Sequence, residues 1–278
     1  MKAVQKRVGR QSLWNQVDGF DRAQSIAVSH AILLAFVITL TLSVAAVGIG
    51  PLTNAQAEAM SGIAEDRFDE WDKTIRSTIE STDPQRQSMT VPTGVYASSV
   101  EKTEITFTNQ DTGSETIIST VWFRYSPRGS DRVITYDSGL VTDQTGETAQ
   151  PSVKQPPSST HFKTGGMDIY TLDLIEYDLD SPITFQTSYS RDYTYDVYPN
   201  ASNITEIDHG TTTDTTIEVR GPNYESWGRY FSDNERDGET GIYTAVDIDH
   251  DNQIAKAVIE NTEFRATAQY VALNESNI

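Results

Sequence analysis

The chain has 278 residues, with 40 acidic against 21 basic side chains and a formal net charge of −19. Nucleic-acid binding needs clustered lysine and arginine, so this charge argues against a nucleic-acid partner. The sequence has no cysteine, which excludes disulfides, a thiol nucleophile and thiolate metal sites. The 13 Tyr, 9 Phe and 4 Trp can build a core, so we interpret the acidity as a surface suited to high salt rather than as disorder.

The N-terminal region has a charge pattern typical of a membrane anchor. Residues 1–23 are basic on balance, and the next formally charged residue after Arg22 is Glu58. Residues 26–52 are almost entirely apolar and exceed the ~20 residues that cross the hydrocarbon core of a bilayer. Because basic flanks stay in the cytoplasm, we predict a single-pass protein of the cell membrane with an extracellular C-terminal domain. The predicted parts are a cytoplasmic leader at 1–23 and a transmembrane helix at 24–52.

The residues just before the apolar segment form a recognisable leader, since 21–25 read DRAQS. Charged residues, a small residue and then glutamine resemble the class III leader of archaeal type IV pilin-like proteins. In that family a prepilin peptidase cuts before the hydrophobic helix, and the resemblance implies a cut between Ala23 and Gln24. It also implies packing with other pilin-like subunits through the N-terminal helix. The family usually has glutamate at the fifth mature position, where this chain has Val28. This difference favours a minor pilin or a monomeric anchor.

Two other interpretations of the apolar segment remain open. A secretory signal is removed after an A-x-A site, and residues 55–57 read AQA, although signal peptides have an apolar stretch of only about 7–15 residues. An uncleaved signal anchor would keep Met1. The mature chain therefore begins at Gln24 in a pilin-like protein, at Met1 in a plain anchor and at Glu58 after removal of a secretory signal.

A helical pattern continues after the apolar segment. Apolar residues recur at spacings of three and four from Met60 to Ile79, and the run stops before Pro84. We predict an amphipathic stalk helix at 53–83, continuous with the transmembrane helix. The alternative is that these residues form the first helix of a domain beside an ordinary anchor.

From residue 95 the hydrophobic period changes to two, which predicts strands. The pattern predicts hairpins of 104–110 with 116–125 and of 242–249 with 253–260, and further strands at 132–141, 168–180, 183–190, 192–198, 215–221 and 263–273. Residues 150–166, rich in Pro, Ser and Gly, read as a loop that would divide two lobes. The predicted fold class is α+β: a long N-terminal transmembrane and stalk helix, followed by a predominantly antiparallel β head at 95–278.

Two groups of residues are candidate binding sites. A short helix predicted at 222–233 presents Tyr224, Trp227 and Tyr230 at helical spacing, either as a ligand platform or, more commonly for such a stripe, as core. Asp247, Asp249 and Asp251 alternate as calcium ligands do. The calcium-loop pattern then fails because it needs Gly and Glu where the chain has Asn252 and Val258, so this is a weak metal candidate.

The sequence carries no catalytic motif for nucleophilic, metal-dependent or phosphate chemistry. Its histidines outside the apolar segment, His161, His209 and His250, lie in apparent loops. We therefore predict a protein that is not an enzyme and has no cofactor. Glycosylation sequons occur at Asn200, Asn203 and Asn274. The predicted function is a pilin-like cell-surface protein with a structural or adhesive role. A surface module that binds a glycan or an envelope partner is the alternative, and an exported hydrolase is less favoured.

Overall fold

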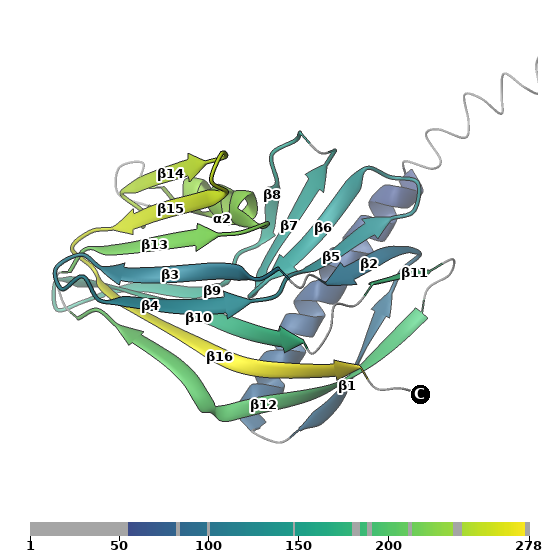
Figure 1. The fold of residues 1–278 in the computed structure, drawn as a ribbon, viewed down its shortest axis with the longest axis horizontal. Helices are drawn as coiled ribbons and strands as arrows, with labels where there is room; N and C mark the ends of the chain where they lie inside the picture. Colours follow the sequence, from purple (N-terminus) through teal and green to yellow (C-terminus); the bar gives the residue numbers. More distant parts are fainter. Residues whose placement is uncertain are drawn as a thin grey trace, which may run out of the picture. The chain divides into compact units, whose positions relative to one another are not determined.

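A computed structural model describes residues 55–81, 84–98, 101–146, 148–179, 184–187, 191–210, 213–235 and 241–275 of the chain (Figure 1). The predicted leader, the cleavage site at Ala23 and Gln24 and the membrane segment at 24–52 lie outside these residues. Among the described residues, no helix combines the length and the apolarity that crossing a bilayer requires.

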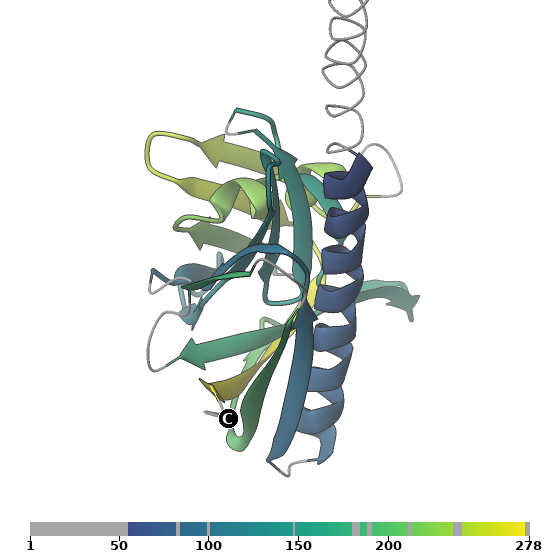
Figure 2. The ribbon, with the colours of Figure 1, turned by 90° about the vertical axis from the view of Figure 1, so that its right-hand side faces the viewer.

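Residues 55–81 are helical, as their period predicts. The apolar stripe is buried, with Phe68, Trp71 and Ile75 each at most 5% exposed. Full burial of one such side chain contributes about 1.5–3 kcal/mol. The helix lies along one side of the strands rather than apart from them (Figure 2). It belongs to the same compact unit as the strands, Ala55–Ile278, so these residues are part of the β-rich domain.

The other described residues of this domain form three sheets and one short helix, with connecting turns (Figure 1). Sheet A has the strand order β1-β12-β16-β10-β9, sheet B β11-β2-β5-β6-β7-β8 and sheet C β14-β15-β13-β3-β4. The elements are β1 (Gln85–Val91), β2 (Gly94–Ser98), β3 (Thr103–Asn109), β4 (Glu115–Thr120), β5 (Phe123–Pro127), β6 (Arg132–Asp137), β7 (Leu140–Thr145), β8 (Ser152–Gln155), β9 (Ser158–Thr164), β10 (Met167–Leu179), β11 (Thr184–Thr187), β12 (Arg191–Asp208), β13 (Thr215–Arg220), α2 (Tyr224–Asp233), β14 (Ala245–Asp249), β15 (Ile254–Ile259) and β16 (Glu263–Glu275).

Two hydrophobic cores lie on opposite faces of sheet A. In β10, Tyr170, Leu172 and Leu174 belong to the core shared with sheet C and α2, whereas Ile175 and Tyr177 belong to the core shared with sheet B and the helix at 55–81. Successive residues of a strand point to opposite faces of the sheet. The even-numbered residues of β10 therefore face one core and the odd-numbered ones face the other. Along β10 the buried side chains therefore change face between Leu174 and Ile175, and the partly buried Asp173 and Glu176 lie on the opposite face in each half.

The predicted fold class, α+β with a long N-terminal transmembrane and stalk helix, is wrong. Among the described residues the fold is mostly β-sheet, with 56% strand, and the helix at 55–81 packs against the sheets. The β-rich prediction itself is confirmed. Strands β10 and β16 pair in parallel, whereas the other strand pairs of the described residues are antiparallel.

Several predicted boundaries also need correction. The β region begins at β1, before residue 95, and the predicted loop at 150–166 contains β8 and β9. The predicted strand 116–125 is two strands, β4 in sheet C and β5 in sheet B. The predicted strand 132–141 is the β6–β7 hairpin, whose turn has positive φ at Ser138 (52°) and Gly139 (95°). Two positive φ angles are typical of the tight turns that join antiparallel strands.

Candidate functional site

The inner face of helix α2 forms part of the core. Trp227 and Phe231 are fully buried, and Tyr224 and Tyr230 are at most 8% exposed. The hydroxyl groups of Tyr230 and Tyr243 lie 2.9 and 3.2 Å from that of Tyr170. The suggested binding aromatics Tyr224, Trp227 and Tyr230 are therefore core residues, because the helix packs this stripe against sheet C.

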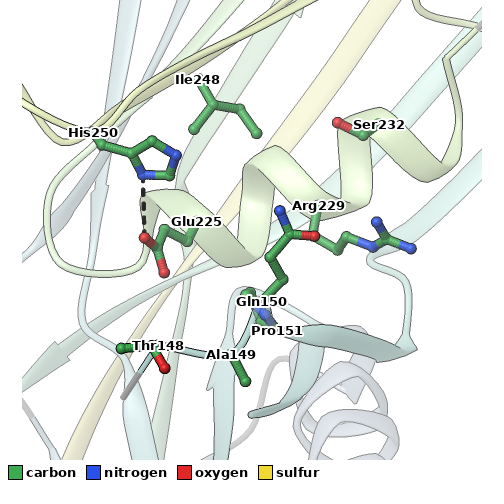
Figure 3. Close-up of a pocket in the computed structure, with 9 residues that line it drawn as sticks. All are labelled: Thr148, Ala149, Gln150, Pro151, Glu225, Arg229, Ser232, Ile248 and His250. Atoms are coloured by element: carbon green, nitrogen blue, oxygen red, sulfur yellow. Dashed lines mark ion pairs between the residues drawn. The ribbon is translucent and has the colours of Figure 1, made fainter. Parts of the chain in front are cut away.

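The outer face of α2 lines a groove of about 300 Å³ (Figure 3). The helix contributes Glu225, Arg229 and Ser232, the β14–β15 hairpin contributes Ile248 and His250, and the segment before β8 contributes Thr148, Ala149, Gln150 and Pro151. Three separate segments therefore build the groove. The groove forms here because α2 packs between the β14–β15 hairpin and sheet B. Ser226 of α2 is hydrogen-bonded to Thr142 of β7, in sheet B, over 2.9 Å.

His250 is held at one end of the groove by two neighbours. Its Nδ1 lies 3.2 Å from Glu225 Oε1 and 2.9 Å from the Tyr224 hydroxyl, which in turn donates to Glu225 over 3.1 Å. Burial, and then the neighbouring Glu225, raise the pKa of Tyr224 to about 12, so this hydroxyl stays protonated at neutral pH. The arrangement fixes the orientation of the imidazole ring.

The groove contains hydrogen-bond donors and acceptors, and charged side chains of both signs. Arg229 lies at the groove and pairs with Asp233 at 2.8 Å, one turn further along α2. Gln150 supplies an amide and Ser232 a hydroxyl. A shallow site with mixed charge and several hydrogen-bonding groups fits a neutral ligand with many hydroxyl groups, such as a sugar, better than a strongly charged one.

The alternating aspartates lie at the end of β14 and in the turn that follows it. Asp249 Oδ1 accepts hydrogen bonds from the backbone N–H groups of Asp251 and Asn252, and Asp249 Oδ2 accepts one from Asn252 Nδ2 at 2.6 Å. The hydrogen bonds from Asn252 lower the pKa of Asp249. Within the described ranges, no three His, Asp or Glu side chains, Asp247, Asp249 and Asp251 included, are placed to hold a metal ion.

The histidines at 161 and 209 lie away from the groove. His209 is 8% exposed and its Nδ1 lies 2.9 Å from Thr215 Oγ1. Burial lowers the pKa of His209, so a neutral core histidine results. His161 lies on the edge strand β9, 3.7 Å from Asp168.

The glycosylation sequons lie on strands β12 and β16. Asn200 and Asn203 lie in β12 at the point where its pairing with β16 shifts register, between Pro199 and Ile204. Asn274 lies near the end of β16, opposite Asp196. A register shift leaves residues outside the regular ladder, which the sequence alone did not reveal.

A buried ionic network, which no sequence pattern indicated, lies at the other core. Asp72 pairs with Arg76 at 2.7 Å and accepts a hydrogen bond from the Tyr136 hydroxyl at 2.6 Å, and that hydroxyl lies 2.8 Å from Tyr177. Burial, first of all, raises the pKa of Tyr136 well above its usual value. The helical spacing of Asp72 and Arg76 was visible in the sequence, but their burial was not.

Comparisons of the chain with protein-family models, with curated proteins and with solved structures find no match. The resemblance to pilin-like proteins therefore stays a prediction from the sequence.

Proposed function

We propose that this chain is a membrane-anchored, pilin-like protein of the surface of a halophilic archaeon, with structural or adhesive work. The observation that carries the proposal is the uncharged segment 26–52, with a basic leader before it and an acidic domain after it. Under the positive-inside rule this charge distribution exports the domain. The absence of catalytic motifs from the sequence favours a non-enzymatic role.

The start of the folded domain supports retention of the anchor. Only Thr53 and Asn54 separate Leu52 from the helix at 55–81. Ala57, the last residue of the A-x-A site, is 6% exposed, and its carbonyl accepts a hydrogen bond from Ser61 Oγ at 3.0 Å. Cleavage after Ala57 would remove the first turn of a helix that packs on the sheets. An intact helix fits an anchor that stays attached to its domain.

The partners follow from this proposal. A prepilin peptidase would cut between Ala23 and Gln24, and the membrane and other pilin-like subunits would contact the N-terminal segment. Glycans on Asn200, Asn203 or Asn274 would face the exterior, because these residues follow the anchor. The acidic, lysine-poor composition suits an exterior with high salt, where repulsion between like charges is screened.

Mass spectrometry of the mature N-terminus tests the pilin-like part of the proposal. A chain beginning at Gln24 supports it, and the substitution Gln24→Trp should then stop processing and leave Met1 in place. A chain beginning at Met1 in the wild type identifies a plain anchor. A chain beginning at Glu58 contradicts anchoring altogether, because the membrane segment would have been removed.

The groove favours a second candidate function, a surface module that binds glycans. This second proposal is supported by the side chains that line the groove together, Glu225, Arg229, Gln150 and His250. We expect the full chain in detergent to retain a sugar on a glycan array, and Arg229→Ala and Glu225→Gln to weaken that signal at least tenfold. Lys73→Ala, an exposed helix residue outside the groove, is the matched control. Equal signals from all variants would exclude the groove as the binding site.

A further inference from the structure

Strand β9 is an open edge of sheet A. It pairs with β10 on one side, and it is the last strand in the order of that sheet. All seven of its residues are exposed, so neither of its faces is covered. Such an edge presents unpaired backbone N–H and C=O groups to any strand that approaches it. Proteins usually protect these edges, which makes a fully exposed one informative.

The charge around β9 is opposite to that of the chain as a whole. Residues 148–167 contain no acidic residue, and within them Lys163 and His161 lie on the same face of β9. Both side chains contact Asp168 on the neighbouring β10, at 3.3 and 3.7 Å. Within the described part of the chain they have no other ion-pair partner. In a protein of net charge −19, an edge strand that carries a lysine and no acidic residue of its own suits the acidic surface of a second copy better than an acidic strand would.

Strand β14 offers the complementary edge. It is the outermost strand of sheet C and pairs with β15 on its other side. Asp247 and Asp249 are two residues apart and therefore lie on one face of the strand, as Lys163 and His161 do on β9. Lys256 lies opposite Asp247 on β15 and is the one basic residue paired with β14 among the described residues.

We propose that β9 of one copy of this chain adds to β14 of a second copy as an antiparallel strand. The register that places Lys163 opposite Asp247 also places His161 opposite Asp249, because both pairs have the same spacing. On the other face it places Phe162, 46% exposed, opposite Ile248. The opposite charges of Lys163 and Asp247 and the apolar pair of Phe162 and Ile248 stabilise such a contact, in addition to the backbone hydrogen bonds.

The contact joins two different surfaces, so it does not close on itself by a two-fold axis. Each copy keeps a free β9 or a free β14, and association continues into an open row or a ring. The contact does not depend on the membrane anchor. It would align the domains of neighbouring copies edge to edge.

The cysteine-free sequence allows a direct test in membranes that contain the full chain. The double variant Lys163→Cys/Asp247→Cys, oxidised under mild conditions, should give a ladder of dimers, trimers and higher species on a non-reducing gel. The control Lys163→Cys/Glu206→Cys places the second cysteine at an exposed acidic position of β12, away from both edges, and should give no ladder.

One single variant and the two double variants separate this contact from its alternatives. Lys163→Cys alone should stay monomeric, and a dimer of it would show a symmetric β9–β9 contact and overturn the proposal. Equal ladders from the double variant and the Glu206 control would show random collision and would overturn it as well. The absence of any ladder from the double variant also overturns it. A ladder that weakens at least fivefold when Phe162→Asp is added would support it further.

Discussion

The indole Nε1 of Trp227 donates a hydrogen bond to the carboxylate of Asp137 over 3.2 Å, although ninety residues separate them in the chain. Asp137 ends β6 and is fully buried, and its Oδ2 also accepts a hydrogen bond from Asn223 Nδ2 at 2.9 Å. Its Oδ1 has no hydrogen-bond partner among the residues that the structure describes. One carboxylate therefore ties the β6–β7 turn of sheet B to the start of α2, where the candidate groove lies.

The burial of Asp137 predicts a pH-dependent stability. Burial raises the pKa of this carboxyl from 3.8 to about 6, against the hydrogen bonds from Asn223 and Trp227. Between pH 4 and pH 6 the folded chain therefore holds more protons than the unfolded chain. The free energy of unfolding should fall by about 3 kcal/mol as the pH rises through this window, and then level off. Urea unfolding followed by tryptophan fluorescence measures it.

The variant Asp137→Asn isolates this contribution from the other titrating groups. It keeps the acceptor for Asn223 and Trp227 but cannot ionise, so it should be more stable than the wild type above pH 6. The two proteins should converge in stability towards pH 4. If the free energies of unfolding of both proteins changed with pH in the same way, the raised pKa of Asp137 would be contradicted.

The ion pair of Asp72 and Arg76 should contribute far more to stability than a similar pair on the same helix. Asp72→Ala leaves a partly buried guanidinium and the Tyr136 hydroxyl without their acceptor, and we expect a loss of about 3–5 kcal/mol. Asp69→Ala breaks an exposed pair with Lys73 and should cost about 1 kcal/mol or less. Chemical denaturation of the two variants gives the comparison, and similar losses would mean that the buried network is not formed.

Two glycines should respond in opposite ways to the same substitution. A Cβ on Gly94 would lie 2.4 Å from the backbone oxygen of Ser126 and 2.7 Å from the Tyr125 ring, so Gly94→Ala should destabilise the β2–β5 pair by about 2 kcal/mol or more. A Cβ on Gly62 meets no atom within 4 Å, and Gly62→Ala should stabilise the helix by up to about 1 kcal/mol. Thermal unfolding of both variants tests the two signs, and a stable Gly94→Ala protein would refute the close approach.

The elements that depend on the local pattern of apolar residues could be predicted from the sequence. The helix at 55–81 and α2 follow from apolar spacings of three and four, and the β3–β4 and β14–β15 hairpins follow from alternation around a turn. The failures have tertiary causes. Val121 and Trp122 look like strand interior, yet the chain leaves sheet C for sheet B there. Strand β9 has few apolar residues, and its pairing with β10 stabilises it instead.

The candidate site was not predictable from the sequence. The aromatic stripe of α2 is conspicuous because it forms the core, whereas Glu225 and Arg229 on the same helix carry no signal. Gln150 and His250 join them only because the segment before β8 and the β14–β15 hairpin meet at α2. Such a convergence depends on tertiary packing, and no spacing in the chain encodes it.

Display of the domain outside the membrane is the central claim, and the cysteine-free sequence allows it to be measured directly. A membrane-impermeant maleimide should label Thr112→Cys, in the exposed β3–β4 turn, on intact cells. In the unprocessed variant Gln24→Trp, which keeps its leader, it should label Gln5→Cys only after lysis. Labelling of Gln5→Cys on intact cells with protection of Thr112→Cys until lysis would contradict the claim.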